Sequence, residues 1–327
     1  MQPVTRCYFD DAFYEARRLG ASDIHLAAQR PVVVRVDGKL REILSHPVLT
    51  PMLEELYEET TDHATDRSHL GGDLTRVLAE PHWGRVRLHW TRSRATLHCS
   101  VRLFQTACPD PGTLGLSPRL CELVGSARGL VLIVGSTGSG KSTTLAALLR
   151  LAAQTQYRKI ITLEDPIEYD LSELPGSIEQ RAVGSDIESL HDGVLSALRS
   201  DPDIIAIGEA RSSDDCNALL RAAETGHFVL ATMHAADAAS AIDRMLRAFP
   251  SGEAAIARTV LADVLLAISA QKLVARPTGG RAFESELLLA TDAVRAIVRD
   301  GKCYQLRNAM TLGGSAGMNR FTRAGSV

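Results

Sequence analysis

The sequence reads Gly135-Ser136-Thr137-Gly138-Ser139-Gly140-Lys141-Ser142 directly after the apolar run of residues 130–134. This spacing, G-x-x-x-x-G-K-[ST], lies between a strand-like run and a helix-like segment, which is the setting of a P-loop. The glycines let the backbone wrap around a phosphate chain, the lysine supplies a mobile charge, and the serine hydroxyl supplies a magnesium ligand. A ligand-free glycine-rich turn would leave the Lys-Ser pair unexplained. We therefore predict a site for ATP and Mg²⁺, with the nucleotide bound by Gly135, Ser136, Thr137, Gly138, Ser139, Gly140, Lys141, Ser142 and Thr143.

Each of three further apolar runs ends close to a polar side chain that suits phosphate chemistry. The runs and their polar residues are 160–163 with Glu164, 204–207 with Glu209, and 228–232 with His234. Because the runs alternate with amphipathic helical patterns, we expect βαβ units and a mostly parallel sheet whose strands end at one edge. Carboxylates at that edge would hold Mg²⁺ through water or polarise the attacking water. Glu164, Glu209 and His234 are therefore candidate catalytic residues, and Ser142 and Glu209 are candidate magnesium ligands.

The organisation of the chain predicts two domains. Residues 1–107 alternate short helical and strand-like stretches around turns such as Asp37-Gly38, which indicates a small α+β domain. Residues 108–118 read CPDPGTLGLSP, and the prolines and glycines favour a linker because they continue neither a helix nor a sheet ladder. Residues 119–327 form the predicted α/β domain that carries the P-loop.

The bulk composition limits the classes of function. The chain has 327 residues, of which 45% are apolar and 23% charged, as in a globular protein of two domains. A net charge of −3 offers no basic surplus, so no nucleic-acid partner is expected. The sequence holds no run of eighteen apolar residues and no secretory signal, which predicts a cytoplasmic chain that does not span a membrane. Six cysteines without C-x-x-C spacing indicate reduced thiols, and we expect no metal beyond magnesium.

Several motifs carry a resemblance to a known family. Besides the P-loop they are the acidic segment 163–168, the segment 198–205, and the run from Ala223-Glu224-Thr225-Gly226-His227 to Thr232-Met233-His234. Together they resemble the secretion ATPases, most closely the PilT-like pilus retraction motors. Residues 21–26 near the start and 313–318 near the end are similar to the opening and closing signatures of that family. The resemblance covers nearly the whole chain.

The resemblance implies a fold and a mechanism. The first domain would be PAS-like, the second a RecA-like P-loop NTPase domain, and six copies would form a ring with ATP between neighbours. Glu164 and Glu209 would act on water and magnesium. Arg85, Arg94 and Arg102 are similar to arginines that reach the nucleotide from the first domain, where a guanidinium would stabilise charge on the γ-phosphate. The alternative is a solvated strand with alternating arginines.

Residues 293–300 stand where retraction motors carry the motif AIRNLIRE. Their apolar positions form one helical stripe, and the two arginines stack four residues apart. Arg295, Ile297 and Arg299 are therefore a candidate surface for an inner-membrane platform protein of a pilus or secretion machine. An ordinary amphipathic surface helix is the alternative. Docking there would place the protein at the inner face of the cell membrane.

The function predicted from these residues is that of a homo-hexameric ATP hydrolase that powers type IV pilus retraction and twitching motility. Extension-type relatives usually add another N-terminal domain and a four-cysteine zinc site, and this sequence shows neither, which favours retraction. A DotB-like ATPase of a type IV secretion or conjugation apparatus is the alternative within the class, because Gly208-Glu209-Ala210-Arg211 also resembles that group. A RecA-fold nucleic-acid motor would need a basic groove with aromatic platforms. A non-hydrolysing regulator would be expected to lack the lysine or an acid.

Overall fold

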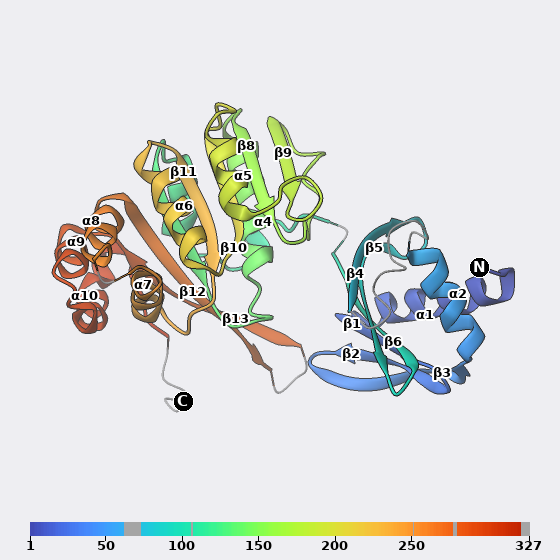
Figure 1. Ribbon diagram of the computed structural model, residues 1–327. Coiled ribbons are helices and arrows are strands. Elements are labelled where there is room, and N and C mark those ends of the chain that lie inside the picture. Colours follow the sequence, from blue (N-terminus) through green and yellow to red (C-terminus); the bar gives the residue numbers. More distant parts are fainter. Residues whose placement is uncertain (62–72, 106, 251, 277–279, 322–327) are drawn as a thin grey trace. The chain divides into compact units, whose positions relative to one another are not determined.

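The computed structural model describes residues 1–61, 73–105, 107–250, 252–276 and 280–321 (Figure 1). The chain forms two compact units. The first is Met1–Thr106 with Pro277–Gly280, and the second is Ala107–Arg276 with Arg281–Val327. Each unit has its own sheet and its own hydrophobic core, so each is stabilised mainly by contacts within itself.

In its described residues, the first unit contains an antiparallel sheet with the strand order β3-β2-β1-β6-β5-β4 and two helices. Strand residues alternate between its faces: Ile24 and Leu26 are buried, whereas His25 between them is half-buried on the opposite face. Phe13 and Leu56 of the two helices pack into the apolar core. The elements are α1 (Pro3–Arg18), β1 (Asp23–Ala27), β2 (Arg30–Val36), β3 (Lys39–Val48), α2 (Thr50–Thr60), β4 (Leu74–Glu80), β5 (Gly84–Ser93) and β6 (Thr96–Leu103).

Two hairpins of this sheet have tight turns in which both central residues take positive φ. Asp37 and Gly38 have φ values of 48° and 81°, and Arg94 and Ala95 have values of 50° and 61°. Turns of this kind match the right-handed twist of the flanking strands. The turn predicted at Asp37-Gly38 is confirmed, and Arg94 lies at the tip of the β5–β6 hairpin.

The second unit is a seven-stranded sheet with the order β13-β12-β7-β11-β10-β8-β9. The four strands predicted from the apolar runs are confirmed as β7, β8, β10 and β11, which are neighbours and parallel. Strands β9, β12 and β13 extend the sheet beyond that prediction, and β13 alone is antiparallel to its neighbour. The elements are α3 (Pro118–Glu122), β7 (Gly129–Val134), α4 (Lys141–Thr155), β8 (Lys159–Glu164), β9 (Ser177–Ala182), α5 (Leu190–Ala197), β10 (Ile204–Ala210), α6 (Ser213–Glu224), β11 (Phe228–Met233), α7 (Ala238–Arg247), α8 (Ala254–Val264), β12 (Leu265–Ala275), β13 (Arg281–Leu289), α9 (Asp292–Arg299) and α10 (Leu306–Leu312).

Helices cover both faces of the second sheet. Leu130 and Leu132 of β7 belong to a core that includes residues of α5 to α10, whereas Val131 and Ile133 belong to a second core with α4. Strands buried on both faces read as continuous apolar runs, which is why the sequence showed them clearly. Among the described residues, no helix has the length and apolar character needed to cross a membrane.

Candidate functional site

The P-loop joins β7 to α4, and its shape depends on its glycines. Gly138 and Gly140 have φ values of 74° and 91°, in the left-handed region that favours glycine. A Cβ on Gly135 would lie 2.4 Å from Ser139 Oγ and 2.5 Å from the carbonyl oxygen of Gln271. The loop therefore curls so tightly that glycine is required at its first position, and it leads directly into the N-terminus of α4.

Lys141 begins α4 and turns back toward the loop. Its Nζ donates to the carbonyl oxygens of Gly135 and Ser136, both at 3.1 Å, and the residue is only 9% exposed. Burial lowers the pKa of Lys141, while the charges of Glu209 and Glu168 oppose that change. A phosphate chain offers this ammonium group charged acceptors, which bind it more strongly than neutral carbonyls do.

Gln271 of β12 supports the loop from the adjacent strand. Its Nε2 donates to the carbonyl oxygen of Ser139 at 2.9 Å, and its side chain is buried. Within the described part of the chain, Ser139 Oγ is buried without a hydrogen-bond partner. An orphaned hydroxyl of this kind needs an acceptor, and a bound phosphate would supply one. Gln271 carries no local sequence signal of this role, because it lies 132 residues from Ser139 in the chain.

Glu209 lies in a bulge at the end of β10. Between Ile207 and Ala210 the strand carries one residue more than β11 opposite it, and a bulge of this kind re-aims side chains. The Thr232 hydroxyl of β11 donates to the carbonyl of Gly208 and so fixes the bulge. The Glu209 carboxylate, 18% exposed, is thereby presented at the carboxyl edge of the sheet.

A histidine and an arginine meet this carboxylate. His234 Nε2 lies 2.5 Å from Glu209 Oε1, and Arg211 Nε donates to Glu209 Oε2 at 2.8 Å. The same guanidinium bonds Asp165 Oδ2 at 3.1 Å, so Arg211 joins the ends of β8 and β10. His234 and Glu209 come together as predicted from their strands, whereas Arg211 is a site residue that the sequence did not single out.

Glu164 ends β8 in a more enclosed setting. Its Oε1 accepts from the Thr162 hydroxyl at 2.7 Å and from Gln180 Nε2 at 3.1 Å. Burial raises the pKa of Glu164 above its usual value, although these hydrogen bonds act against the shift. Gly208 packs within 3.2 Å of the Glu164 backbone, measured from where a Cβ would stand, so β8 and β10 approach closely at this edge. A carboxyl group of raised pKa at the sheet edge that also carries the P-loop is suited to accept a proton from water.

The residues present fit a magnesium ion of the P-loop kind. Ser142 lies half-buried in the first turn of α4, and the Glu209 carboxylate lies close enough to Lys141 to influence its pKa. The described residues hold no cluster of three or more His, Cys, Asp or Glu side chains that would bind a metal alone. Mg²⁺ in nucleotide sites takes few protein ligands besides phosphate oxygens and water, and a hydroxyl with one carboxylate meets that need.

The three candidate arginines lie in the first unit, where the sheet holds one of them far from the other two. Arg102 faces Arg87 across β5 and β6, and its Nε bonds Asp23 Oδ1 at 3.0 Å. Arg85 lies two residues from Arg87 on the same strand, with its guanidinium 5.9 Å from the ring centre of Phe104. Arg94 is seven residues beyond Arg87, roughly 23 Å away at the rise of an extended strand. Arg85 and Arg102 are thus grouped, and Arg94 is not.

The candidate platform surface lies on α9. Arg295 Nη1 donates to the carbonyl oxygen of Asp263 at 2.8 Å and also to that of Ala262, at the end of α8. Arg299 Nη2 lies 2.5 Å from Asp263 Oδ1, and Ile297 packs partly buried against the core. Both arginines therefore stabilise the carboxyl end of α8 within the unit. Sequence spacing placed them on one face without showing what that face contacts.

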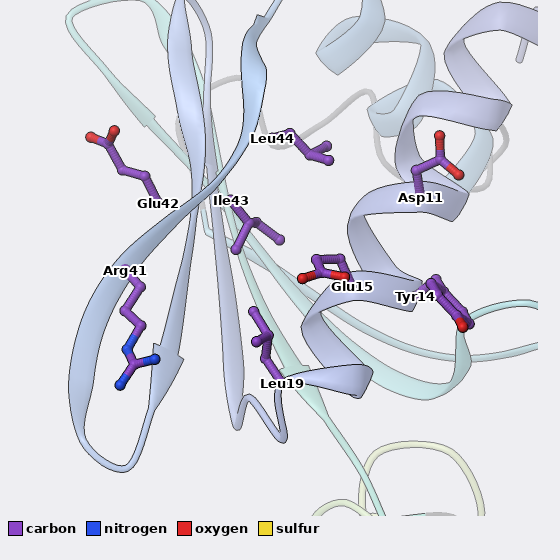
Figure 2. Close-up of a pocket in the computed structure, with 8 residues that line it drawn as sticks. All are labelled: Asp11, Tyr14, Glu15, Leu19, Arg41, Glu42, Ile43 and Leu44. Carbon is purple, nitrogen blue, oxygen red and sulfur yellow. The ribbon is translucent and has the colours of Figure 1, made fainter.

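A cavity of about 600 Å³ lies in the first unit rather than beside the P-loop (Figure 2). It opens between α1 and β3, with Asp11, Tyr14 and Glu15 on the helix and Arg41 and Glu42 on the strand (Figure 2). Its lining mixes acids with a single arginine, and none of the predicted site residues belongs to it.

Comparison with known proteins identifies the class. Residues 1–311 match the model of the family described as Type II/IV secretion system protein, so the chain belongs to that family. One relative is the uncharacterized protein YggR of Escherichia coli (strain K12), 38% identical over 93% of this chain and 92% of that protein. Another is the type IV pilus retraction ATPase PilT of Pseudomonas aeruginosa, 36% identical over 91% of this chain and 87% of that protein.

Solved structures agree with this assignment. The pilus retraction motor PilT with bound ADP matches with a TM-score of 0.84 at 34% identity, covering 93% of this chain and 89% of that one. The Legionella pneumophila ATPase DotB matches with a TM-score of 0.82 at 27% identity, covering 98% and 90%. The chain is therefore a PilT-like secretion ATPase, with a RecA-like domain that follows a small N-terminal domain.

Proposed function

We propose that the chain hydrolyses ATP as a homo-hexamer and uses the energy to power type IV pilus retraction, and hence twitching motility. The observation that carries the proposal is the edge where the P-loop, Glu209 and His234 meet, in a chain similar over nearly its whole length to the retraction motor PilT. The same edge carries Glu164, so binding and hydrolysis would occur in one place.

Binding would begin at the P-loop. Its backbone N–H groups and the start of α4 receive the phosphates, and Lys141 exchanges the carbonyls of Gly135 and Ser136 for phosphate oxygens. Ser142 and Glu209 would hold Mg²⁺, which supplies neutralisation of the phosphate charge. His234 and Arg211 keep the Glu209 carboxylate in place, so that its orientation is set before the nucleotide binds.

Hydrolysis would then require an oriented water. Glu164 is the candidate proton acceptor, because burial raises its pKa while Thr162 and Gln180 fix its position. In this assignment Glu209 serves the metal and Glu164 serves the water. An arginine from the first unit would stabilise the charge that develops on the transferred phosphoryl group.

The proposed hexameric ring and its membrane partner are supported by the similarity to the family. Six copies would form a ring in the cytoplasm, at the inner face of the cell membrane, with α9 and its residues Arg295, Ile297 and Arg299 offered to an inner-membrane platform protein. Because Arg295 and Arg299 already bind α8, partner contact there would act on α8 and α9 together.

The test is ATP hydrolysis by the purified chain, followed together with its mass in solution. We expect a six-subunit species with turnover, and Glu209→Gln should lower kcat on the order of 10²–10³-fold while nucleotide binding persists. Glu122→Gln is the matched control, since Glu122 is exposed on α3, lies outside the motifs of the site, and should leave turnover unchanged. A monomer that binds ATP without hydrolysing it would refute the proposal.

The similarity to DotB supports a second candidate, an ATPase of a type IV secretion or conjugation apparatus. Deletion of the gene in its own organism separates the two. Loss of retraction should abolish twitching and leave more pili on the cell surface. Normal twitching together with loss of secretion or conjugation would instead favour the DotB-like function.

A further inference from the structure

The loop that carries His234 is anchored at its far end by Asp237, the N-cap of α7. Asp237 Oδ1 accepts from the Ser240 backbone N–H at 2.7 Å, and Ser240 Oγ accepts from the Asp237 N–H at 3.0 Å. This capping box satisfies orphan donors at the helix start and fixes the backbone there. Any group that holds the Asp237 carboxylate therefore also holds the connection between β11 and α7.

Arg307 of α10 binds the same carboxylate. Its Nη2 lies 2.7 Å from Asp237 Oδ2, so one carboxylate oxygen caps α7 and the other binds α10. The Asp237 side chain is 21% exposed, and burial would raise its pKa, but the hydrogen bonds from Ser240 and Arg307 lower it overall. The carboxylate is therefore held in its charged form, and the contact is a charge-assisted hydrogen bond.

Glu286 of β13 ties the start of α7 to the C-terminal segment. The side chain is 6% exposed, and its Oε1 accepts from the Ala238 backbone N–H at 2.8 Å. The next residue of β13, Leu287, pairs with Asn319 through two backbone hydrogen bonds. The C-terminal segment, β13 and the first turn of α7 thus form one hydrogen-bonded assembly, to which Arg307 adds α10.

From this arrangement we infer that Arg307 is a positioning residue for ATP hydrolysis: through Asp237 it holds the loop in which His234 faces Glu209. The inference rests on the proposed function, because it requires that this edge hydrolyses ATP. His234 Nε2 lies 2.5 Å from Glu209, so a small displacement of the loop separates the two groups. Since α10 packs against α9, the candidate platform helix, a partner bound there gains a physical route to the catalytic edge.

A simpler interpretation is an ordinary surface ion pair, because the Arg307 side chain is 63% exposed. Such pairs contribute little to stability, and their removal leaves kinetics unchanged. A positioning role makes a different prediction. Arg307 does not touch the P-loop, so its loss should lower kcat while KM for ATP stays constant.

The experiment measures steady-state ATP hydrolysis by the full-length hexamer for Arg307→Ala, Arg307→Lys, Asp237→Asn and the Asp237→Asn/Arg307→Ala double variant. Asn is as good an N-cap as Asp, so Asp237→Asn removes the charge and keeps the cap. The matched control is Arg247→Ala at the other end of α7, where the side chain is 83% exposed and its nearest acid, Asp243, lies 3.9 Å away.

We expect Arg307→Ala and Asp237→Asn each to lower kcat about threefold to tenfold, which lies within the range found for coupling through packed networks, with KM unchanged. The double variant should be no slower than either single variant, because both remove the same contact. Arg307→Lys should restore most of the rate, and Arg247→Ala should match the wild type.

Several results would overturn the inference while leaving the proposed function intact. One is a wild-type kcat in Arg307→Ala. A second is a double variant whose loss of kcat is the product of the losses in the two single variants. A third is a loss of kcat that is accompanied by a lower melting temperature and that Arg307→Lys does not restore. Absence of turnover in the wild-type hexamer would instead remove the proposed function, and the inference with it.

Discussion

The two sheets of the molecule distribute their functional residues in opposite ways. In the second unit β7, β11, β10 and β8 run parallel, and the residues at their carboxyl ends, Lys141, His234, Glu209 and Glu164, gather at one edge. In the first unit the strands are antiparallel, and Arg85 and Arg94 lie at opposite ends of one hairpin. Strand direction, rather than residue type, decides whether polar residues converge.

The parallel edge brings together a phosphate loop, two carboxylates and a histidine without help from another chain. The antiparallel sheet offers its arginines at separated places, so a single nucleotide can be served by one end of the sheet only. The chemistry of the second unit is thus built locally, and any contribution of the first unit to the proposed hydrolysis would depend on which end of its sheet met the phosphates.

The largest expected effect on kcat depends on which end of the first unit's sheet supplies an arginine to the phosphates. We expect the end with Arg85 and Arg102 to act, because Arg87 lies beside them on the same face and concentrates positive charge there. Arg85→Ala and Arg102→Ala should each lower kcat on the order of 10³-fold, whereas Arg94→Ala should stay within about twofold of the wild type. The measurement is steady-state hydrolysis by variants shown to assemble as the wild type does.

Arg94→Ala serves here as the matched control, since it removes the same side chain from the other end of the same strand pair. An equally large loss of kcat in all three variants would contradict the proposed difference between the two ends of the sheet, because strands of this length cannot place all three guanidiniums on one phosphate group. A loss confined to Arg94→Ala would reverse the assignment of the ends.

A smaller effect, on nucleotide affinity, should follow from a substitution that adds a methyl group inside the P-loop of the second unit. In Gly135→Ala the new methyl group would meet Ser139 Oγ and the backbone of Gln271, at distances that require the loop or β12 to shift. Overpacking of this kind costs about 1–3 kcal/mol, which would correspond to a loss of about fivefold to 150-fold in nucleotide affinity if the cost falls on the bound state. Titration with a fluorescent ATP analogue measures it.

Gly252→Ala is the control for that substitution. A Cβ at Gly252 meets nothing within 4 Å, so this variant should bind nucleotide as the wild type does. Unchanged affinity in Gly135→Ala would show that the tight curl of the loop is not required for binding. The convergence at the parallel edge would then depend on Lys141 and the acids alone.

The two units also differ in how much of their structure can be predicted from the sequence. The P-loop is contiguous, and the apolar runs and their order imply a parallel sheet, so the ends at Glu164, Glu209 and His234 were predictable. Contacts between distant residues were not. Arg211 meets Asp165 across 46 residues, and Gln271 meets Ser139 across 132, with no local pattern to indicate either pair.

In the first unit the sequence shows the alternating arginines but not the turn that separates them. Arg94 and Ala95 take positive φ without the glycine or asparagine that usually signals such a turn. On α9 the spacing of Arg295 and Arg299 gives a shared face, yet only the structure shows that this face binds the end of α8. Residue type and spacing predict faces, and tertiary packing decides what the faces meet.

The smallest expected effect concerns the stability of the catalytic edge against pH. Burial raises the pKa of Glu164 above the usual 4.5, so the folded state holds this proton more tightly than the unfolded chain does. Stability from the protonated form is complete below pH 4.5 and is lost as the pH rises through the folded pKa. Glu164→Gln mimics the protonated form and lacks that loss, so its stability relative to wild type should increase as the pH rises above 4.5 and through the folded pKa.

Urea unfolding of both proteins at several pH values measures this difference. Glu179→Gln is the control of opposite sign, because the hydrogen bond from Arg181 lowers the pKa of Glu179. Both the folded and the unfolded forms of Glu179 are ionised over most of that range, so this variant should keep a nearly constant difference from wild type. Parallel curves for Glu164→Gln as well would mean that Glu164 titrates normally. The assignment of the water-activating role to Glu164 would then lose its electrostatic basis, and Glu209 would have to serve both the metal and the water.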